Sequence, residues 1–343
     1  MNIQIINPIE YPNWDDLLLT NDQTTFFHTS AWASVLSEAY NYKPLYFTIV
    51  EDGQISVLIP IMEINSFLTG KRGVSLPFTD ECCPIAKNNE KFQHLTKFIF
   101  EYGEKAGWKN IELRGNHNAL TNLPAYKSYY THVLDLDESE NRIFSSFKSN
   151  VKRNIKRALK EGLQVNLSNT WESMMTFCRL NCMTRKKHGL PPQPLSFFKK
   201  IFEHIILPQN GLIVQALIQM KPIAGAVYYH FGNHAVYKYG ASDRKYLNLR
   251  PNNLVMWEAI KYYINNQFQN LSFGRTEPDN HGLLHFKRGW GTREETLNYY
   301  KYDLKQDCFV SKESKLRTSY NIFKHMPSPL LRLTGNILYR HVG

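Results

Sequence analysis

The sequence lacks the features that mark membrane-spanning, secreted and fibrous proteins. No stretch approaches the roughly 18 apolar residues that a spanning helix needs, and the first residues show no basic segment followed by an apolar run, as a signal peptide would. Five cysteines in 343 residues do not suggest a disulfide framework. With 43% hydrophobic residues, disorder, collagen and coiled-coil rods are excluded. We therefore expect a globular, cytoplasmic protein of about two domains.

Glycine-rich nucleotide loops are also missing. Neither the Walker nor the Rossmann glycine pattern occurs, so nucleotide hydrolysis and dinucleotide chemistry have no support. No Ser-His-Asp or Cys-His order stands out. His281 and His285 are four residues apart, but the rest of a zinc pattern is absent, so we expect no metal.

Positive charge is concentrated in the second half of the chain. Residues 1–140 contain 10 Lys+Arg and 18 Asp+Glu, whereas residues 141–343 contain 31 and 12. Such asymmetry indicates an anionic partner for the second half, which could be nucleic acid, a nucleotide-linked substrate or an anionic membrane surface. The alternative is a basic solvated face that serves solubility alone.

The clearest local signal is residues 142–160, which we predict to form one amphipathic helix. Apolar residues recur every three or four positions and make one face: Phe144, Phe147, Val151, Ile155 and Leu159. Cations make the neighbouring face: Lys148, Lys152, Arg153, Lys156, Arg157 and Lys160. Phosphates are the natural partners of such a stripe, because like charges four residues apart repel when no anion is bound. A solvated surface helix, or a helix lying on anionic lipid, remains the alternative.

The order of predicted elements repeats. A helix over 89–106 precedes a strand over 108–115, and a helix over 251–267 precedes a strand over 268–276, at an offset of 160. We therefore expect an α/β (α+β) fold with two similar lobes, each a mixed, mainly antiparallel sheet flanked by helices. The predicted division is 1–140, 141–305 with the basic helix, and a helical extension over 306–343.

Two further segments carry candidate chemistry. A polar loop with Arg244 and Arg250 leads into the helix that begins at Pro251, where an anion could sit on the helix N-terminus; an ordinary loop is the alternative. Residues 274–291 combine acidic and basic groups after a buried-looking strand. There Lys287 could stabilise a developing oxyanion or bind a carboxylate, or be a surface lysine.

Together these segments resemble the Fem family of aminoacyl- and peptidyltransferases and the GNAT-like acyltransferases grouped with it. The most specific matches are FKSNVKRNIKRALKEG and GLLHFKRGWG, and the likeness covers about 26–305. The resemblance implies two GNAT-like lobes, no tightly bound cofactor and no metal. Fem enzymes transfer an aminoacyl group from charged tRNA to an amine of a peptidoglycan precursor, and related members use acyl-CoA.

The resemblance also assigns residues. Lys287 falls on the basic residue of the family's Phe-Lys-x-x-aromatic-Gly motif, and Arg153 and Arg157 fall on its cationic helix. The helical arm of some Fem members is missing. The glycine-rich pyrophosphate loop of acetyl-CoA-dependent enzymes is also absent, and Arg244 to Arg250 stand in its place, which favours a donor other than CoA.

We thus expect an acyltransferase that joins an activated carbonyl to an acceptor amine on a cell-envelope precursor, of peptidoglycan or polysaccharide, with aminoacyl-tRNA or acyl-CoA as donor. The expected catalytic residues are Lys287 as the cation, Asp243 and Glu277 as proton acceptors, and Tyr239 as an orienting group. The expected substrate and phosphate contacts are Lys152, Arg153, Lys156, Arg157, Arg244, Arg250 and Arg288.

The sequence also permits two alternatives. The chain could instead be a non-catalytic module that binds nucleic acid or a membrane surface, although no DNA partner is expected. Its last helix, predicted over Leu330–Tyr339, could dock on the core, which we favour because short helices usually end there, or contact the membrane at its inner face.

Overall fold

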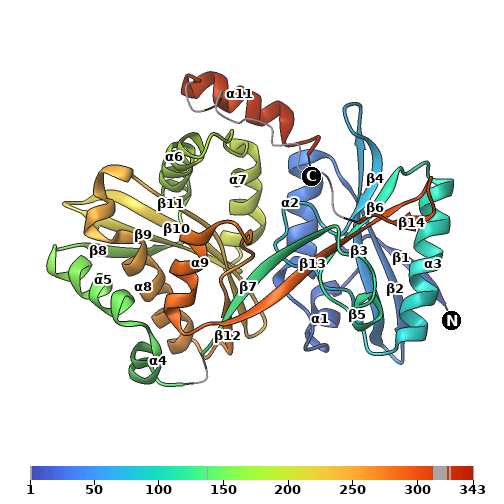
Figure 1. Ribbon diagram of the computed structural model, residues 1–343, viewed down its shortest axis with the longest axis horizontal. Helices are drawn as coiled ribbons and strands as arrows, with labels where there is room; N and C mark the ends of the chain where they lie inside the picture. The colour runs from blue at the N-terminus through green and yellow to red at the C-terminus, as the bar shows by residue number, and fades with distance from the viewer. Residues whose placement is uncertain (1, 137, 312–322, 324–325, 343) are drawn as a thin grey trace. The chain divides into compact units, whose positions relative to one another are not determined.

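The computed structural model describes residues 2–136, 138–311, 323 and 326–342 (Figure 1). These residues form two compact units. Unit 1 holds the chain up to Tyr129, the segment that begins at Thr296 and the last residues from Ile337, and unit 2 holds Tyr130–Glu295 and the segment that ends at Asn336. Among the described residues, no helix combines the length and the apolar character that crossing a membrane requires.

Unit 1 is built on a six-stranded sheet in the order β1-β2-β3-β4-β6-β13. Among the described pairings of this sheet, β4 and β6 are parallel and the other neighbours are antiparallel. Two short strands lie outside this order, since β5 pairs with β3 and β14 pairs with β13. The strands are β1 (Ile3–Ile6), β2 (Lys43–Glu51), β3 (Gln54–Ser66), β4 (Gly70–Val74), β5 (Ile85–Ala86), β6 (Asn110–Arg114), β13 (Arg293–Asp303) and β14 (Cys308–Phe309). The helices are α1 (Trp14–Leu19), η1 (Phe26–His28), α2 (Ser30–Tyr40), α3 (Asn89–Lys105) and η2 (Asn118–Leu120).

Unit 2 repeats this order with the strands β8-β9-β10-β11-β12-β7, and here β11 and β12 are the parallel pair. The strands are β7 (Lys127–Asp135), β8 (Gln164–Ser168), β9 (Gly211–Ile218), β10 (Lys221–Phe231), β11 (His234–Ser242) and β12 (Asn270–Ser272). The helices are α4 (Glu140–Ser146), α5 (Ser149–Lys160), α6 (Trp171–Lys187), α7 (Leu195–Ile201), η3 (Phe202–Ile206), η4 (Arg244–Leu249), α8 (Pro251–Asn265), α9 (His281–Lys287) and η5 (Arg288–Trp290). A further helix, α11 (Ser328–Leu338), lies near the C-terminus (Figure 1).

The predicted duplication corresponds to a real repeat of topology. In each unit a hairpin strand is followed by a helix, α3 or α8, and then by a strand that pairs in parallel with that hairpin strand. The last strand of each sheet comes from an unexpected place in the chain. β13 follows the strands of unit 2 in the sequence but pairs with β6 of unit 1, and β7 precedes the other strands of unit 2 and pairs with β12. The expected mixed α/β fold with mainly antiparallel sheets is confirmed.

The exchange of the last strands explains why the compact units differ from the linear division at 140 and 305. A sequence pattern can locate a strand, but the partner of that strand is decided by hydrogen bonding across the sheet. Part of the predicted extension over 306–343, residues 312–322 and 324–325, lies outside the described residues.

Residue preferences explain several of the turns and caps. Asp52 and Gly53 both have positive φ angles, 48° and 72°, which is the geometry of the two-residue hairpin turn that an Asp-Gly pair favours. Thr29 caps α2, since its hydroxyl accepts a hydrogen bond from the Trp32 backbone N–H at 3.3 Å. The β9–β10 turn lies at Gln219 and Met220.

Two sequence predictions were wrong in extent. The helix expected over 142–160 is two helices, α4 and α5, separated by the extended residues Phe147 and Lys148. Phe147 packs edge-on against Trp257 and Trp290, and the Lys148 backbone N–H donates to the Gly289 carbonyl at 2.9 Å. The strand expected over 268–276 is only the three residues of β12.

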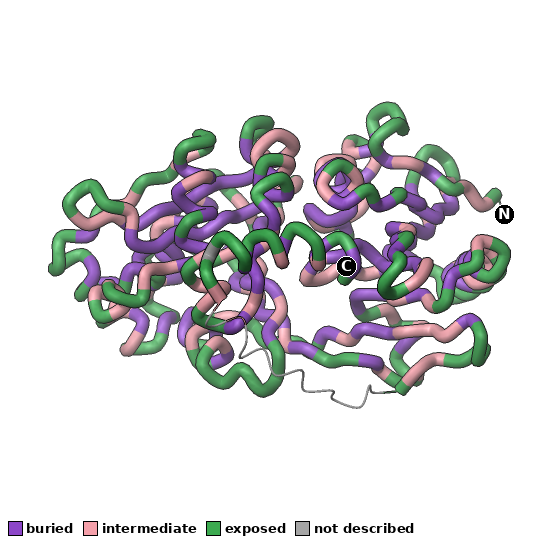
Figure 2. Tube along the Cα trace, turned by 90° about the horizontal axis from the view of Figure 1, so that it is seen from above, coloured by how far each residue is buried: buried purple, intermediate pink, exposed green. Residues whose placement is uncertain are grey.

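Each unit has its own apolar core. In unit 1, α3 packs on the sheet through Phe92, Leu95 and Ile99. In unit 2, α8 packs on the other sheet and α5 packs against α8. Figure 2 marks the buried positions in purple. Leu159, expected on the buried face of the basic helix, is 53% exposed, and Ala158 is buried in its place.

Candidate functional site

Lys287 ends helix α9 and is only 2% exposed. Its Nζ donates hydrogen bonds to the carbonyl oxygens of Gly274 at 2.7 Å and Arg275 at 3.2 Å, in the loop that follows β12. Burial of an ammonium is costly, so such groups are held by oxygen acceptors, as here. The alternative of a surface lysine is therefore excluded.

The helix that carries Lys287 is set by local sequence. The Asn280 side chain caps α9 by accepting a hydrogen bond from the Leu283 backbone N–H at 3.2 Å. After Lys287 the backbone tightens into the 3-10 helix η5. This helix is capped at its C-terminal end by Gly291, whose φ of +71° favours glycine. Trp290 is fully buried against Phe273 and Phe286, which anchors the segment.

A polar cluster adjoins Lys287, and sequence reasoning missed most of it. We define the β7 cluster as Tyr130, His132, Thr276, Arg288 and Glu294. His132 is fully buried, and its Nε2 lies 2.8 Å from Glu294 Oε2. Arg288 donates hydrogen bonds to both oxygens of the same carboxylate. Its Cζ lies 5.8 Å from the centroid of the Tyr130 ring.

The electrostatics of the β7 cluster favour a neutral imidazole. Burial lowers the pKa of His132, and the Lys287 cation lowers it further, against the opposing effect of Glu294. The hydrogen bonds from Arg288 lower the pKa of Glu294, so its carboxylate is ionised and accepts from His132 Nε2. Among the described residues, neither the buried His132 Nδ1 nor the buried Thr276 Oγ1 has a hydrogen-bond partner.

His132 Nδ1 and Thr276 Oγ1 belong to residues on neighbouring segments of the sheet of unit 2. Tyr130 and Thr276 form an isolated bridge, with reciprocal backbone hydrogen bonds of 2.9 and 2.7 Å. Residues directly opposite each other project to the same face, and so do residues two apart on one strand. His132, Tyr130 and Thr276 therefore lie on one face of β7. A polar histidine within the strand sequence was the only signal that could have located this cluster.

The basic helix α5 contacts the segment that carries Lys287. At its N-terminus the Lys148 N–H bonds to the Gly289 carbonyl, and Asn150 Nδ2 lies 3.3 Å from His285 Nε2. A side chain at Gly289 would meet Val151 Cγ2 at 2.7 Å, so glycine permits the close approach. The first turn of α5 is thus fixed against α9 and η5.

The exposed face of α5 carries the predicted phosphate contacts. Arg153, Lys156, Arg157 and Lys160 line a surface hollow of about 500 Å³ together with Glu161. Lys152 lies beside them, with its Nζ donating to the Ser145 carbonyl at 2.9 Å. The ion pair of Arg157 with Glu161 is long, 3.6 Å, and both groups are exposed, so it opposes anion binding little.

The other predicted residues lie on separate segments. Tyr239, on β11, is half-buried against Phe197 and Phe198. Asp243 caps η4 by accepting from the Lys245 N–H at 3.0 Å. Glu277 is exposed in the loop that Lys287 holds.

The expected anion site before α8 has an unexpected form. Arg244 begins the 3-10 helix η4, and Arg250 has a φ of 62° immediately before Pro251. Both arginines are exposed, so they are available to an anion near the N-terminus of α8. Among the described residues, β11 and β12 pair over three residues, and β11 extends beyond this pairing toward η4.

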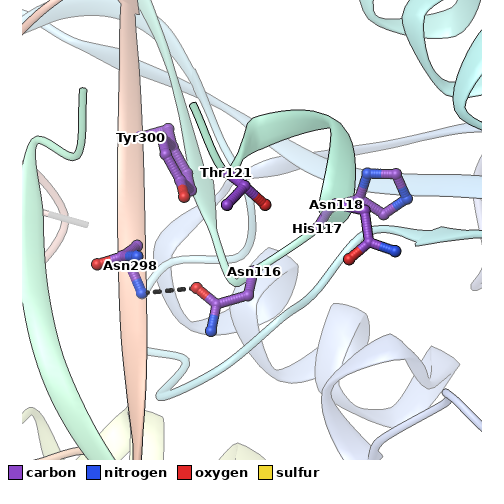
Figure 3. A pocket seen from close by; sticks show the side chains of 6 residues that line it. All are labelled: Asn116, His117, Asn118, Thr121, Asn298 and Tyr300. Carbon is purple, nitrogen blue, oxygen red and sulfur yellow. Dashed lines mark hydrogen bonds between the residues drawn. The ribbon is translucent and has the colours of Figure 1, made fainter. Parts of the chain in front are cut away.

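Unit 1 has a hollow of its own, of about 330 Å³ (Figure 3). Its lining is rich in amides, from Asn116, Asn118 and Asn298. Asn116 is already engaged with the backbone of β13: its Oδ1 accepts from the Asn298 N–H at 3.0 Å and its Nδ2 donates to the Thr296 carbonyl. The His117 ring nitrogens bond to the Ala119 N–H and the Ala86 carbonyl. These polar groups hold the loop in place.

Comparison with known proteins agrees with the fold and with the resemblance seen in the sequence. Residues 145–288 match the acetyltransferase (GNAT) domain family. The chain is 33% identical over 94 residues to a lipid II:glycine glycyltransferase of Staphylococcus epidermidis, a match covering 25% of this chain and 23% of that protein. It is 22% identical over 250 residues to the lipid II:glycine glycyltransferase of Staphylococcus haemolyticus, covering 52% of this chain and 59% of that protein.

Solved structures extend the likeness to most of the chain. The crystal structure of FemX superposes with a TM-score of 0.70 at 15% identity, covering 89% of this chain and 98% of that one. A tandem GNAT protein from the clavulanic acid biosynthesis pathway gives 0.55 at 9% identity, covering 88% and 99%. The expected resemblance to Fem-type, GNAT-like transferases is confirmed, and the GNAT match supports the prediction of an acyltransferase. The matched parts span less than two thirds of the length of these glycyltransferases.

Proposed function

We propose that this protein is an aminoacyltransferase that forms an amide on an amine of a cell-envelope precursor, with aminoacyl-tRNA as the donor. One observation carries the proposal: the cationic helix α5 is fixed at its N-terminus against the segment that ends in the buried Lys287. A phosphate chain held along α5 would lead toward that cation. The names of the staphylococcal relatives support an acceptor of the lipid II type.

The reaction follows from the chemistry of an ester donor. The acceptor nitrogen attacks the ester carbonyl carbon and forms the C–N bond, and the C–O bond to the ribose then breaks. The amine proton passes to a base, and the ribose oxygen takes up a proton as it leaves. Lys287 would stabilise the oxyanion of the tetrahedral intermediate, and Tyr239 would orient the carbonyl. Asp243, Glu277 and the neutral His132 are the candidate proton acceptors.

The cations divide between donor and acceptor phosphates. Lys152, Arg153, Lys156 and Arg157 would bind tRNA through charge-assisted hydrogen bonds, and Arg244 and Arg250 would hold a second phosphate group before α8. Arg288, already bonded to Glu294, would contribute its charge near the acceptor. A lipid-linked acceptor would present its amine at the inner face of the membrane.

An acyl-CoA-dependent N-acyltransferase is the second candidate, favoured by the match to the acetyltransferase domain. Against it, η4 and Arg250 replace the glycine-rich loop before α8. The third candidate is a non-catalytic module that binds nucleic acid or a membrane surface.

The test is a transfer assay on the full chain. The protein is incubated with labelled glycyl-tRNA or acetyl-CoA and with lipid II or its soluble UDP-linked precursor, and the formation of labelled amide product is measured. The proposal expects transfer from tRNA, with tRNA binding that weakens steeply as salt rises. R153Q/R157Q should reduce the salt slope by about two, whereas K261M, on the far end of α8, should not change it. Transfer from acetyl-CoA alone would establish the second candidate, and no transfer from either donor would refute both.

A further inference from the structure

We infer that the hollow of unit 1 is a binding site for a sugar, that is, for a neutral ligand that carries many hydroxyl groups. The hollow has a volume of about 330 Å³ and lies between the loop that follows β6 and the strand β13 (Figure 3). Its lining residues are Asn116, His117, Asn118, Thr121, Asn298 and Tyr300. The residues of the proposed transfer chemistry all belong to unit 2, so this inference goes beyond the proposed function and is independent of it.

The walls of the hollow are held in place by hydrogen bonds of the protein itself. Asn116 joins the loop to β13, since its Oδ1 accepts from the Asn298 N–H at 3.0 Å and its Nδ2 donates to the Thr296 carbonyl at 2.6 Å. Asn298 Oδ1 in turn accepts from the Ser128 hydroxyl at 2.8 Å. A site whose walls are already ordered loses little conformational entropy when a ligand binds.

The lining residues carry no formal charge. None of them is Lys, Arg, Asp or Glu. The His117 ring is neutral too, because its Nδ1 accepts from the Ala119 N–H at 3.2 Å while its Nε2 lies 3.0 Å from the Ala86 carbonyl, and only a neutral ring has an accepting nitrogen. A phosphate or a carboxylate would meet no opposite charge among these residues, although a desolvated ion needs one. The hollow therefore favours a neutral ligand.

The backbone beside the hollow is not available to an extended peptide. Such peptides are recognised by adding a strand to an open sheet edge. Here the Asn298 N–H is bonded to Asn116 and the Asn298 carbonyl accepts from the Gly115 N–H at 3.1 Å, while the Thr296 carbonyl is bonded to Asn116 Nδ2. A ligand in the hollow must therefore be recognised by side chains.

The side chains that remain for a ligand are amides and hydroxyls. Asn118 and Thr121 are exposed, and within the described part of the chain neither side chain has a hydrogen-bond partner. Tyr300 is only 3% exposed, and in Figure 3 its hydroxyl points toward Thr121 and Asn116. Amides and hydroxyls both donate and accept, as does each hydroxyl of a sugar, whereas an apolar ligand would leave them unpaired.

The experiment is saturation-transfer NMR, which detects weak ligands, on the full chain with methyl glucoside and N-acetylglucosamine. Transfer to either sugar supports the inference. T121W fills the hollow from an exposed position and should abolish the transfer. N118A/T121V removes the two unpartnered polar groups, and each lost neutral hydrogen bond should weaken binding about two- to tenfold.

N65A is the matched control, because Asn65 is an exposed asparagine of unit 1 that lies on β3, outside the hollow. It should bind the sugars as the wild type does. Melting temperatures equal to that of the wild type would show that the variants are folded. If T121W does not fold, N118A/T121V decides the question.

The inference is overturned if neither sugar receives saturation from the wild type, or if folded T121W or N118A/T121V binds as the wild type does. Transfer to N-acetylalanine methylamide in place of the sugars would assign the hollow to a peptide and overturn it as well. Inorganic phosphate that displaces the sugars from the hollow would do the same in favour of an anion. Sugar binding needs neither donor nor turnover, so its failure is distinct from failure of the transfer assay.

Discussion

Replacing Lys287 by methionine is the sharpest test of how the buried cation acts. The side chain lies in the interior of unit 2 and donates to the carbonyls of Gly274 and Arg275. Each hydrogen bond from a charged donor contributes about 1.5–3 kcal/mol, and that contribution is lost in K287M. The variant also no longer buries an ammonium, which removes a penalty of several kcal/mol. The two effects oppose each other, so we expect the free energy of unfolding to change by less than about 3 kcal/mol.

Activity should respond far more strongly than stability. If Lys287 stabilises the oxyanion, its removal should reduce kcat by about 100- to 1000-fold, equivalent to roughly 2.7–4 kcal/mol of transition-state stabilisation. K287R keeps the charge, but its planar fork does not reproduce the position of a single ammonium, so it should restore little activity. Thermal unfolding and single-turnover aminoacyl transfer, measured on the same preparations, separate the two effects.

A structural role for Lys287 predicts the reverse pattern. An anchor of the 274–275 loop would lower the melting temperature when removed and leave kcat within about tenfold for the molecules that remain folded. K261M serves as the control, because Lys261 forms a partly exposed pair with Glu258 at 2.8 Å. Near-normal turnover by a folded K287M would refute the assignment of the cation to the chemistry.

Three other outcomes test the local physics. Burial lowers the pKa of His132 below 6.5, so the unfolded chain binds the proton more readily than the folded chain does. The contribution of His132 to stability should therefore be fully present above about pH 6.5 and be lost as the pH falls through the pKa of the folded state. Thermal unfolding of the wild type and H132N between about pH 7.5 and 5 should show a smaller loss of stability in the variant. G335A should destabilise the docking of α11 by about 1–3 kcal/mol despite the better helix propensity of alanine, because its Cβ meets the Pro192 carbonyl; limited proteolysis that cuts both proteins equally would contradict this. G73A should lower the melting temperature through contact of its Cβ with the Trp108 ring at 2.4 Å, and relief by the double variant with W108F, whose ring is smaller, would verify the cause.

Much of the architecture could be predicted because it is encoded locally. The Asp52-Gly53 turn, the Thr29 cap and the start of α8 at Pro251 follow from backbone preferences of single residues. The repeated helix-strand order revealed two similar units. The prediction of a single helix over 142–160 was wrong because the helical spacing of apolar residues continues past Phe147 and Lys148, whereas the backbone of these two residues is extended.

The candidate site was predicted less completely. The motif GLLHFKRGWG pointed to Lys287, and the charge stripe pointed to α5. Neither indicated that Lys287 is buried, nor that His132 and Glu294, 162 residues apart, lie within hydrogen-bond distance. The sequence by itself thus determined the element types, the repeat and the cationic helix, because periodicity and turn chemistry act over a few residues. Only the tertiary structure decided the exchange of β7 and β13, the burial of the lysine and the partners of the histidine, because strand pairing and desolvation depend on residues that are distant in the chain.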